Sequence, residues 1–188
     1  MSVLGRAFVA VVPPDHVLDA IEARVAPVRA AHDGLRWSRR EQWHLTLRFL
    51  GAVPDVDRLV SALGDALSTV LTLPALQLGG AGAFPNARRA SVVWFGGRAG
   101  ADSLGLVASA VESASVAAGF VPEPRPFAAH LTVARVPRPR DVTAVLDVLG
   151  VEPVGAAWPV DDVVLVSSDT RPTGAVYDEI TRIRLLPP

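Results

Sequence analysis

Two segments of this 188-residue chain decide its fold: His44-Leu45-Thr46-Leu47-Arg48-Phe49-Leu50-Gly51 and His130-Leu131-Thr132-Val133-Ala134-Arg135. Both begin with His-Leu-Thr, and the chain has only 4 His, so composition alone does not account for the repeat. In each segment apolar residues alternate with more polar ones, which is the pattern of a half-buried β-strand. The sequence therefore predicts two similar strands, one in each half of the chain.

The alternation of side chains along a strand predicts which residues share a face. His44, Thr46 and Arg48 are expected on one face, with the leucines and the phenylalanine between them on the other. His130 and Thr132 likewise share a face. Each half is thus predicted to present an imidazole and a hydroxyl on one surface, backed by apolar packing.

Strand and helix patterns alternate along the rest of the chain. Strands are expected at 7–12, 43–50, 75–78, 91–95, 129–136, 160–167 and 175–185, and helices at 17–28, 56–67, 104–114 and 142–149. A Gly-rich loop is expected between the third and fourth strands. This order predicts an α+β protein, a single bilobal domain over 1–188 with similar halves at about 1–97 and 98–188. We expect two small, mostly antiparallel sheets flanked by helices, with approximate two-fold symmetry and a central cleft.

Composition excludes several kinds of chemistry. All 18 basic residues are Arg, and Cys is absent, which removes Schiff-base lysines, thiolate nucleophiles and thiolate metal sites. The net charge of −1 argues against a protein that coats nucleic acid or anionic membrane. The longest uncharged stretch, Ala66–Ala87, contains Pro and Gly and would not hold a membrane-spanning helix, and no signal peptide is recognisable. We expect a cytoplasmic protein.

Arginines surround both repeated segments. Four lie between Arg36 and Arg48, against Glu41, and four lie between Arg125 and Arg140 with no acidic residue. Because guanidinium groups bind phosphate in a bidentate manner, these windows indicate a phosphate site, with Arg48 as one candidate ligand. In the second window, Arg138 and Arg140 stand beside prolines and are expected to be solvated loop residues.

Two imidazoles in one cleft suit in-line displacement at phosphorus, which needs a base for the entering oxygen and an acid for the leaving one. Histidine can fill both roles near neutral pH, and threonine hydroxyls can donate to phosphate oxygens. The alternative without chemistry is a solvated polar sheet face, with Thr favoured by its strand propensity. A zinc site is less favoured, because Glu41 is the only carboxylate near either motif and no second His stands at ligand spacing.

The two segments, together with Arg125-Pro126-Phe127-Ala128-Ala129 before the second, resemble the signatures of the 2H phosphoesterase superfamily. Within it they are similar to the RNA 2′,3′-cyclic phosphodiesterase family, formerly called 2′-5′ RNA ligases. The resemblance covers nearly the whole chain, including Gly82-Ala83-Phe84-Pro85-Asn86 and a C-terminal hairpin with Tyr177.

The resemblance implies roles for individual residues. His44 would donate a proton to the ribose 3′ oxygen, and His130 would accept one from water, leaving a 2′-phosphomonoester. Thr46 and Thr132 would hold the phosphate. Arg135 matches an Arg of the family, although strict alternation puts it on the face opposite His130 unless the strand ends or bulges first.

The resemblance implies no metal or nucleotide cofactor. Its expected partners are RNA ends or small cyclic nucleotides with a 2′,3′-cyclic phosphate, with no membrane and no obligate protein partner, so we expect a monomer. Two alternatives stay open: ATP-independent 2′-5′ ligation at the same site, and a non-catalytic module that binds phosphorylated RNA ends.

Overall fold

The computed structural model describes residues 3–171 and 174–187. The helices are α1 (Asp15–Ala31), α2 (Val56–Leu67), α3 (Ala101–Ala117) and α4 (Thr143–Leu149), with short 3-10 turns η1 (Arg40–Gln42) and η2 (Ala87–Arg89). The strands are β1 (Leu4–Val11), β2 (Arg36–Trp37), β3 (Leu45–Val53), β4 (Leu73–Phe84), β5 (Ala90–Ala99), β6 (His130–Arg140), β7 (Pro153–Val160), β8 (Asp162–Arg171) and β9 (Gly174–Arg184). The predicted α+β class is confirmed.

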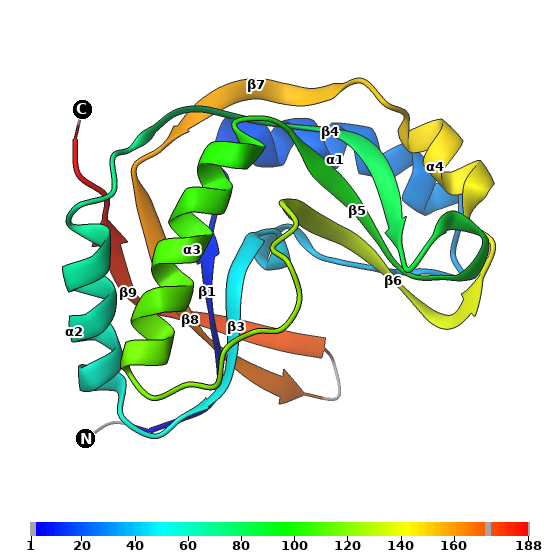
Figure 1. Ribbon diagram of the computed structural model, residues 1–188. Coiled ribbons are helices and arrows are strands. Elements are labelled where there is room, and N and C mark those ends of the chain that lie inside the picture. Colours follow the sequence, from blue (N-terminus) through cyan, green and yellow to red (C-terminus); the bar gives the residue numbers. More distant parts are fainter. Residues whose placement is uncertain (1–2, 172–173, 188) are drawn as a thin grey trace.

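The strands form one curled sheet (Figure 1), so the prediction of two small sheets is wrong. The order is β7-β4-β5-β6-β3-β1-β8-β9, with β2 added to β6, and neighbouring strands run antiparallel. In the described part of the chain, β3 and β6 pair at a single position, Leu45 with Leu131, and both leucines are fully buried. Sequence periodicity cannot show this join, because a single pair between distant segments leaves no repeating pattern.

The helices cover the two sides of this junction differently. Helices α2 and α3 lie side by side against the part that contains β3 and β9, whereas α1 and α4 pack against β7 and β4 (Figure 1). The order strand, helix, strand, helix occurs twice, as β1-α1-β3-α2 and as β5-α3-β6-α4. The repeated segments therefore occupy matching places, at the start of β3 and of β6.

The run Gly79-Gly80-Ala81-Gly82 belongs to β4, where the sequence predicted a loop. Gly80 has a φ of +67°, which favours glycine, and Gly82 is needed for close packing. A Cβ at Gly82 would lie 2.2 Å from the Trp94 ring on β5, a contact that no real side chain makes. The Gly-rich sequence thus lets β4 pass beneath an aromatic ring next to the second repeated segment.

Local signals explain the helices. Helix α2 begins where the Asp55 carboxylate accepts a hydrogen bond from the Arg58 backbone N–H at 3.0 Å. Its buried residues Leu59, Leu63 and Leu67 recur every four positions and face the core. Among the residues that the structure describes, no helix has the length and apolar character to cross a membrane.

Candidate functional site

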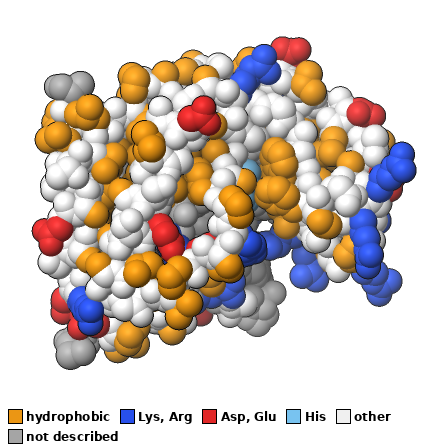
Figure 2. Space-filling model, viewed as in Figure 1, with side chains coloured by type: hydrophobic (Ala, Val, Ile, Leu, Met, Phe, Trp, Pro, Cys, Tyr) orange, Lys and Arg blue, Asp and Glu red, His pale blue; other side chains and the backbone are white. Residues whose placement is uncertain are grey.

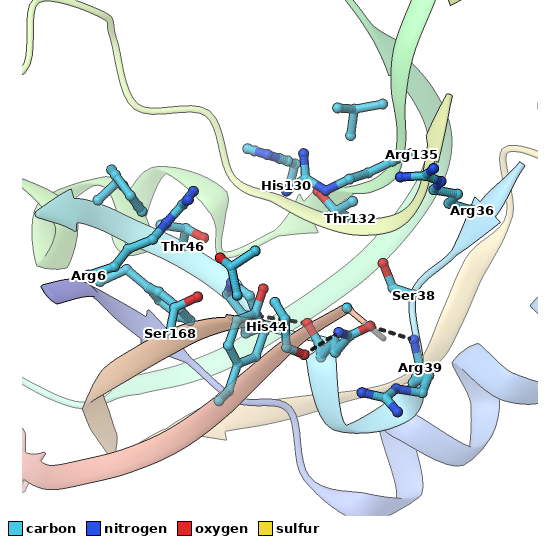
Figure 3. A pocket seen from close by; sticks show the side chains of 18 of the residues that line it. Arg6, Arg36, Ser38, Arg39, His44, Thr46, His130, Thr132, Arg135 and Ser168 are labelled. Atoms are coloured by element: carbon cyan, nitrogen blue, oxygen red, sulfur yellow. Dashed lines mark hydrogen bonds between the residues drawn. The ribbon is translucent and has the colours of Figure 1, made fainter. Parts of the chain in front are cut away.

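The junction of β3 and β6 brings the two histidines together. His44 directly precedes β3 and His130 begins β6, so the imidazoles flank the Leu45–Leu131 pair and line one cavity of about 1070 Å³ (Figure 3). Thr46 and Thr132 line the same cavity. All four residues that the repeat predicted therefore meet in one place.

Both histidines are held by the same kind of hydrogen bond. His44 Nδ1 lies 2.8 Å from the Gln42 carbonyl oxygen, and His130 Nδ1 lies 2.7 Å from that of Ala128. A carbonyl oxygen only accepts, so Nδ1–H is the donor in both rings. Nε2 is thereby left on each ring to exchange a proton.

A β-bulge in β6 brings Arg135 into the cavity. Val93 and Trp94 are neighbours on β5, but their partners on β6, Ala134 and Thr132, are two positions apart. The extra residue reverses the alternation of side chains. Arg135 therefore lies on the same side as His130 and lines the cavity beside Arg36 (Figure 3).

The first segment contains the same irregularity. Val9 and Ala10 are neighbours on β1, and their partners on β3 are Arg48 and Thr46, again two positions apart. The expected shared face of His44, Thr46 and Arg48 is therefore wrong. The bulge turns Arg48 away from the cavity and brings Phe49 into it.

Arg48 is a buried structural cation. Its Nη1 lies 2.9 Å from a Glu112 carboxylate oxygen on α3 and 3.8 Å from one of Glu123, and its Nη2 donates to the Val121 carbonyl oxygen. These contacts tie β3 to α3 and to the loop that follows it. The prediction that Arg48 binds substrate is wrong, because the bulge in β3 places Arg48 on the face that points away from the cavity. The sequence carries no signal of this bulge.

The cavity is positively charged. Its lining includes five arginines: Arg6, Arg36, Arg39, Arg125 and Arg135. No described lining residue is Asp or Glu. Arg125 pairs with Glu123 (Nε to Oε1, 2.8 Å), and the Arg6 guanidinium lies 4.9 Å from the centre of the Phe49 ring. The other three have no carboxylate partner in the described residues, so a chain of net charge −1 has a cavity suited to an anion.

His44 is packed among aromatic rings. The Phe8 ring stacks on it at 4.5 Å between centroids, and the Tyr177 ring meets it edge-on at 5.4 Å. Burial lowers the pKa of His44 to about 4, with the positive charge of His130 and Arg135 acting in the same direction and the bond to Gln42 opposing it. His44 is therefore neutral at pH 7 in the free protein.

The aromatic surroundings of His130 are arranged differently. The Phe84 ring meets it edge-on at 4.9 Å, and the Trp94 ring lies 6.3 Å away. No ring stacks on it face to face as Phe8 does on His44 among the described residues. The two imidazoles thus share a hydrogen-bonding arrangement but differ in their aromatic contacts.

Sequence reasoning missed Arg6 and Phe8, which β1 places in the cavity. The run 7–12 is apolar at every position, so no alternation of polar and apolar residues singles out Phe8. Arg6 stands two positions before Phe8 and is therefore expected on the same strand face. Its charge is the one sequence signal for that face. In the described part of the chain, no group of three or more His, Asp or Glu side chains is placed to hold a metal ion.

An α+β fold whose sheet brings two imidazoles into one cationic cavity has the arrangement that the resemblance to the 2H phosphoesterases predicts. The chain belongs to the 2′-5′ RNA ligase superfamily, whose family model matches residues 14–172.

Relatives and solved structures agree with this membership. An RNA 2′,3′-cyclic phosphodiesterase of Methanothermobacter thermautotrophicus is 30% identical, with 96% of this chain and 98% of the relative covered. One of Thermus thermophilus is 34% identical, with 96% and 90% covered. A crystal structure of a Thermus thermophilus protein matches with a TM-score of 0.74 at 30% identity, covering 96% of this chain and 97% of the other. E. coli LigT in complex with NADP+ matches with a TM-score of 0.69 at 26% identity, covering 98% and 99%.

Proposed function

We propose that this protein hydrolyses RNA 2′,3′-cyclic phosphodiester ends to 2′-phosphomonoesters, with His44 as the proton donor and His130 as the proton acceptor. The observation that carries the proposal is that both imidazoles, each with Nδ1 on a carbonyl, meet in one cavity lined by arginines and, among the described residues, by no Asp or Glu. The names of the Methanothermobacter and Thermus relatives support the substrate class.

The proposed reaction is an in-line displacement at phosphorus. A water molecule attacks the phosphorus atom, and His130 Nε2 takes a proton from that water. The bond from phosphorus to the ribose 3′ oxygen breaks, and His44 gives its proton to that oxygen. Thr46, Thr132 and Arg135 hold the non-bridging oxygens as negative charge grows on them. Proton exchange with solvent then restores both rings.

The lowered pKa of His44 makes its acid role depend on the substrate. In the free cavity the ring is neutral, because burial and the nearby cations disfavour its charged form. A phosphodiester anion next to the ring attracts its charged form and raises the pKa of His44. In this proposal His44 therefore gains its proton as the anionic substrate binds.

The same pair of groups can also catalyse a ligation. If the 5′ hydroxyl of a second RNA replaces water, attack on the cyclic phosphate forms a 2′-5′ linkage without ATP. The family name, 2′-5′ RNA ligase, favours this as the second candidate function.

Product analysis tests the proposal. An RNA oligomer with a 2′,3′-cyclic phosphate end, incubated with the protein and a chelator, is expected to give a 2′-phosphate end. The double variant His44→Ala/His130→Ala is the blank. A 3′-phosphate product would overturn the role assignment, and the same turnover in the blank would overturn the mechanism. Tight binding without turnover by the unaltered protein would favour the non-catalytic module.

A further inference from the structure

Strand β6 continues beyond the cavity and ends in two exposed arginines. The segment Val136-Pro137-Arg138-Pro139-Arg140 follows Arg135. Arg138 and Arg140 are two positions apart on a strand and have no carboxylate partner in the described residues. The nearest acid in sequence, Asp141, uses its carboxylate to accept a hydrogen bond from the Thr143 N–H at 2.8 Å. The charge of these two arginines is therefore not neutralised by an ion pair.

These arginines continue the positive charge of the cavity outward. In the antiparallel register of β2 and β6, the backbone of Arg36 lies opposite that of Arg135. The Arg140 guanidinium lies against Gly34, just before β2, since a Cβ there would be only 2.6 Å from Arg140 Nη2. We call Arg36, Arg138 and Arg140 the arginine rim. Figure 2 shows basic side chains gathered at the lower right of the molecule, beside the hollow at its centre.

The end of β6 that carries Arg138 and Arg140 is exposed and irregular. Between Arg135 and Arg140 strand β6 advances five residues while its partner β5 advances only two, from Val92 to Ala90, so this end of β6 bulges out of the regular ladder. Pro137 and Pro139 have no backbone N–H, so this stretch cannot pair fully with an added strand and stays available to another ligand. Grooves that hold single-stranded nucleic acid use this kind of positive track along the backbone.

We propose that the arginine rim binds the phosphodiester backbone of the nucleotides that precede the cyclic end. The protein then acts on single-stranded RNA oligomers in preference to cyclic mononucleotides. This rests on the proposed function of the cavity, and it replaces the prediction that Arg138 and Arg140 are only solvated loop residues. The near-neutral remainder of the chain confines RNA binding to this rim and the cavity.

The test compares a hexanucleotide that ends in a 2′,3′-cyclic phosphate with a 2′,3′-cyclic mononucleotide. The double variant Arg138→Gln/Arg140→Gln is expected to lower kcat/KM about tenfold for the hexanucleotide and to leave the mononucleotide nearly unchanged. The slope of log KM against log salt concentration should fall by about 1.4, the value for two lost contacts to a single strand. The matched control is Arg58→Gln/Arg184→Gln, which removes the same charge from exposed positions on α2 and β9.

Three results would overturn the proposal: an equal loss on both substrates, no loss on the hexanucleotide, or the same loss in the control. If the unaltered protein hydrolyses neither substrate, the proposed function fails, and the rim is judged by binding. Fluorescence anisotropy of a labelled hexanucleotide with a 2′-phosphate end then decides. Weaker binding by the Arg138/Arg140 double variant supports the rim, and equal binding refutes it. Equal weakening towards double-stranded RNA would show a general anion surface and also refute it.

Discussion

The two segments His44-Leu45-Thr46 and His130-Leu131-Thr132 have the same three residues but different surroundings. Each histidine donates Nδ1–H to the carbonyl two residues before it, and each strand bulges just after its threonine. His44 is enclosed by Phe8, which stacks on it, and Tyr177, whereas His130 has edge-on contacts with Phe84 and Trp94. The local motif therefore sets ring orientation, and the neighbouring strands set which aromatic rings surround each imidazole.

The residues after each bulge also differ. At matching places the first segment has Arg48 and Phe49, and the second has Ala134 and Arg135. The positive charge that lies inside the protein on the first side lies in the cavity on the second. A repeated motif can thus supply two equal rings while the neighbouring residues give the two sides different charges.

The largest effect on turnover is expected when either imidazole is removed. His44→Ala or His130→Ala should each lower kcat on a cyclic-ended RNA about 10³-fold, because proton transfer by one positioned group contributes roughly 10²- to 10⁴-fold. The measurement is steady-state turnover at pH 7 with a chelator present. A single variant that stays within tenfold of the unaltered protein would show that the two sides are not both needed.

The lowered pKa of His44 predicts a loss of stability in acid. In the unfolded chain the ring has its ordinary pKa of about 6.5, and in the folded protein the pKa is about 4, so between these values the unfolded state binds the extra proton. Stability is full above pH 6.5 and falls as the pH drops to 4, by about 3 kcal/mol from this group. Urea unfolding at several pH values, with the His44→Gln variant as reference, measures it. Parallel curves for both proteins would contradict the assigned cause.

Arg48 is expected to affect stability more than catalysis. Arg48→Met leaves Glu112 and Glu123 without their buried cation, and both carboxylates are partly exposed, so we expect a loss of about 2 kcal/mol in the free energy of unfolding. The kcat should change little, since Arg48 does not line the cavity. Unfolding and turnover are measured on the same preparation. A loss of kcat at unchanged stability would show that Arg48 acts in the site and not as a structural cation.

The smallest effect is expected from substitutions of Arg135 and Phe49, the two residues that the bulges bring into the cavity. Arg135→Gln should lower kcat/KM about tenfold or more, because it removes a charged hydrogen bond to phosphate worth roughly 1.5–3 kcal/mol. Phe49→Leu keeps an apolar side chain at the matching place and should lower it less. If Phe49→Leu has the larger effect, recognition depends on the aromatic wall more than on phosphate charge.

The sequence could predict the residues at the centre of the site but not all of its lining. His44, Thr46, His130 and Thr132 were predictable, since a repeated tripeptide on two strands needs no knowledge of distant contacts. The position of Arg135 could not be decided, because a bulge depends on pairing with β5 and not on residues within β6. The same limit explains why Arg48 was placed on the wrong face.

By itself the sequence determined the α+β class, the paired imidazoles and the absence of thiol and amine chemistry, because these depend on residue types and short-range periodicity. Only the tertiary structure decided that the strands form one sheet, that both bulges reverse the strand faces, and that His44 is desolvated. Strand pairing and burial arise from contacts between segments far apart in the chain. Such contacts determine which aromatic rings enclose each of two identical motifs, and burial among them is what lowers the pKa of His44.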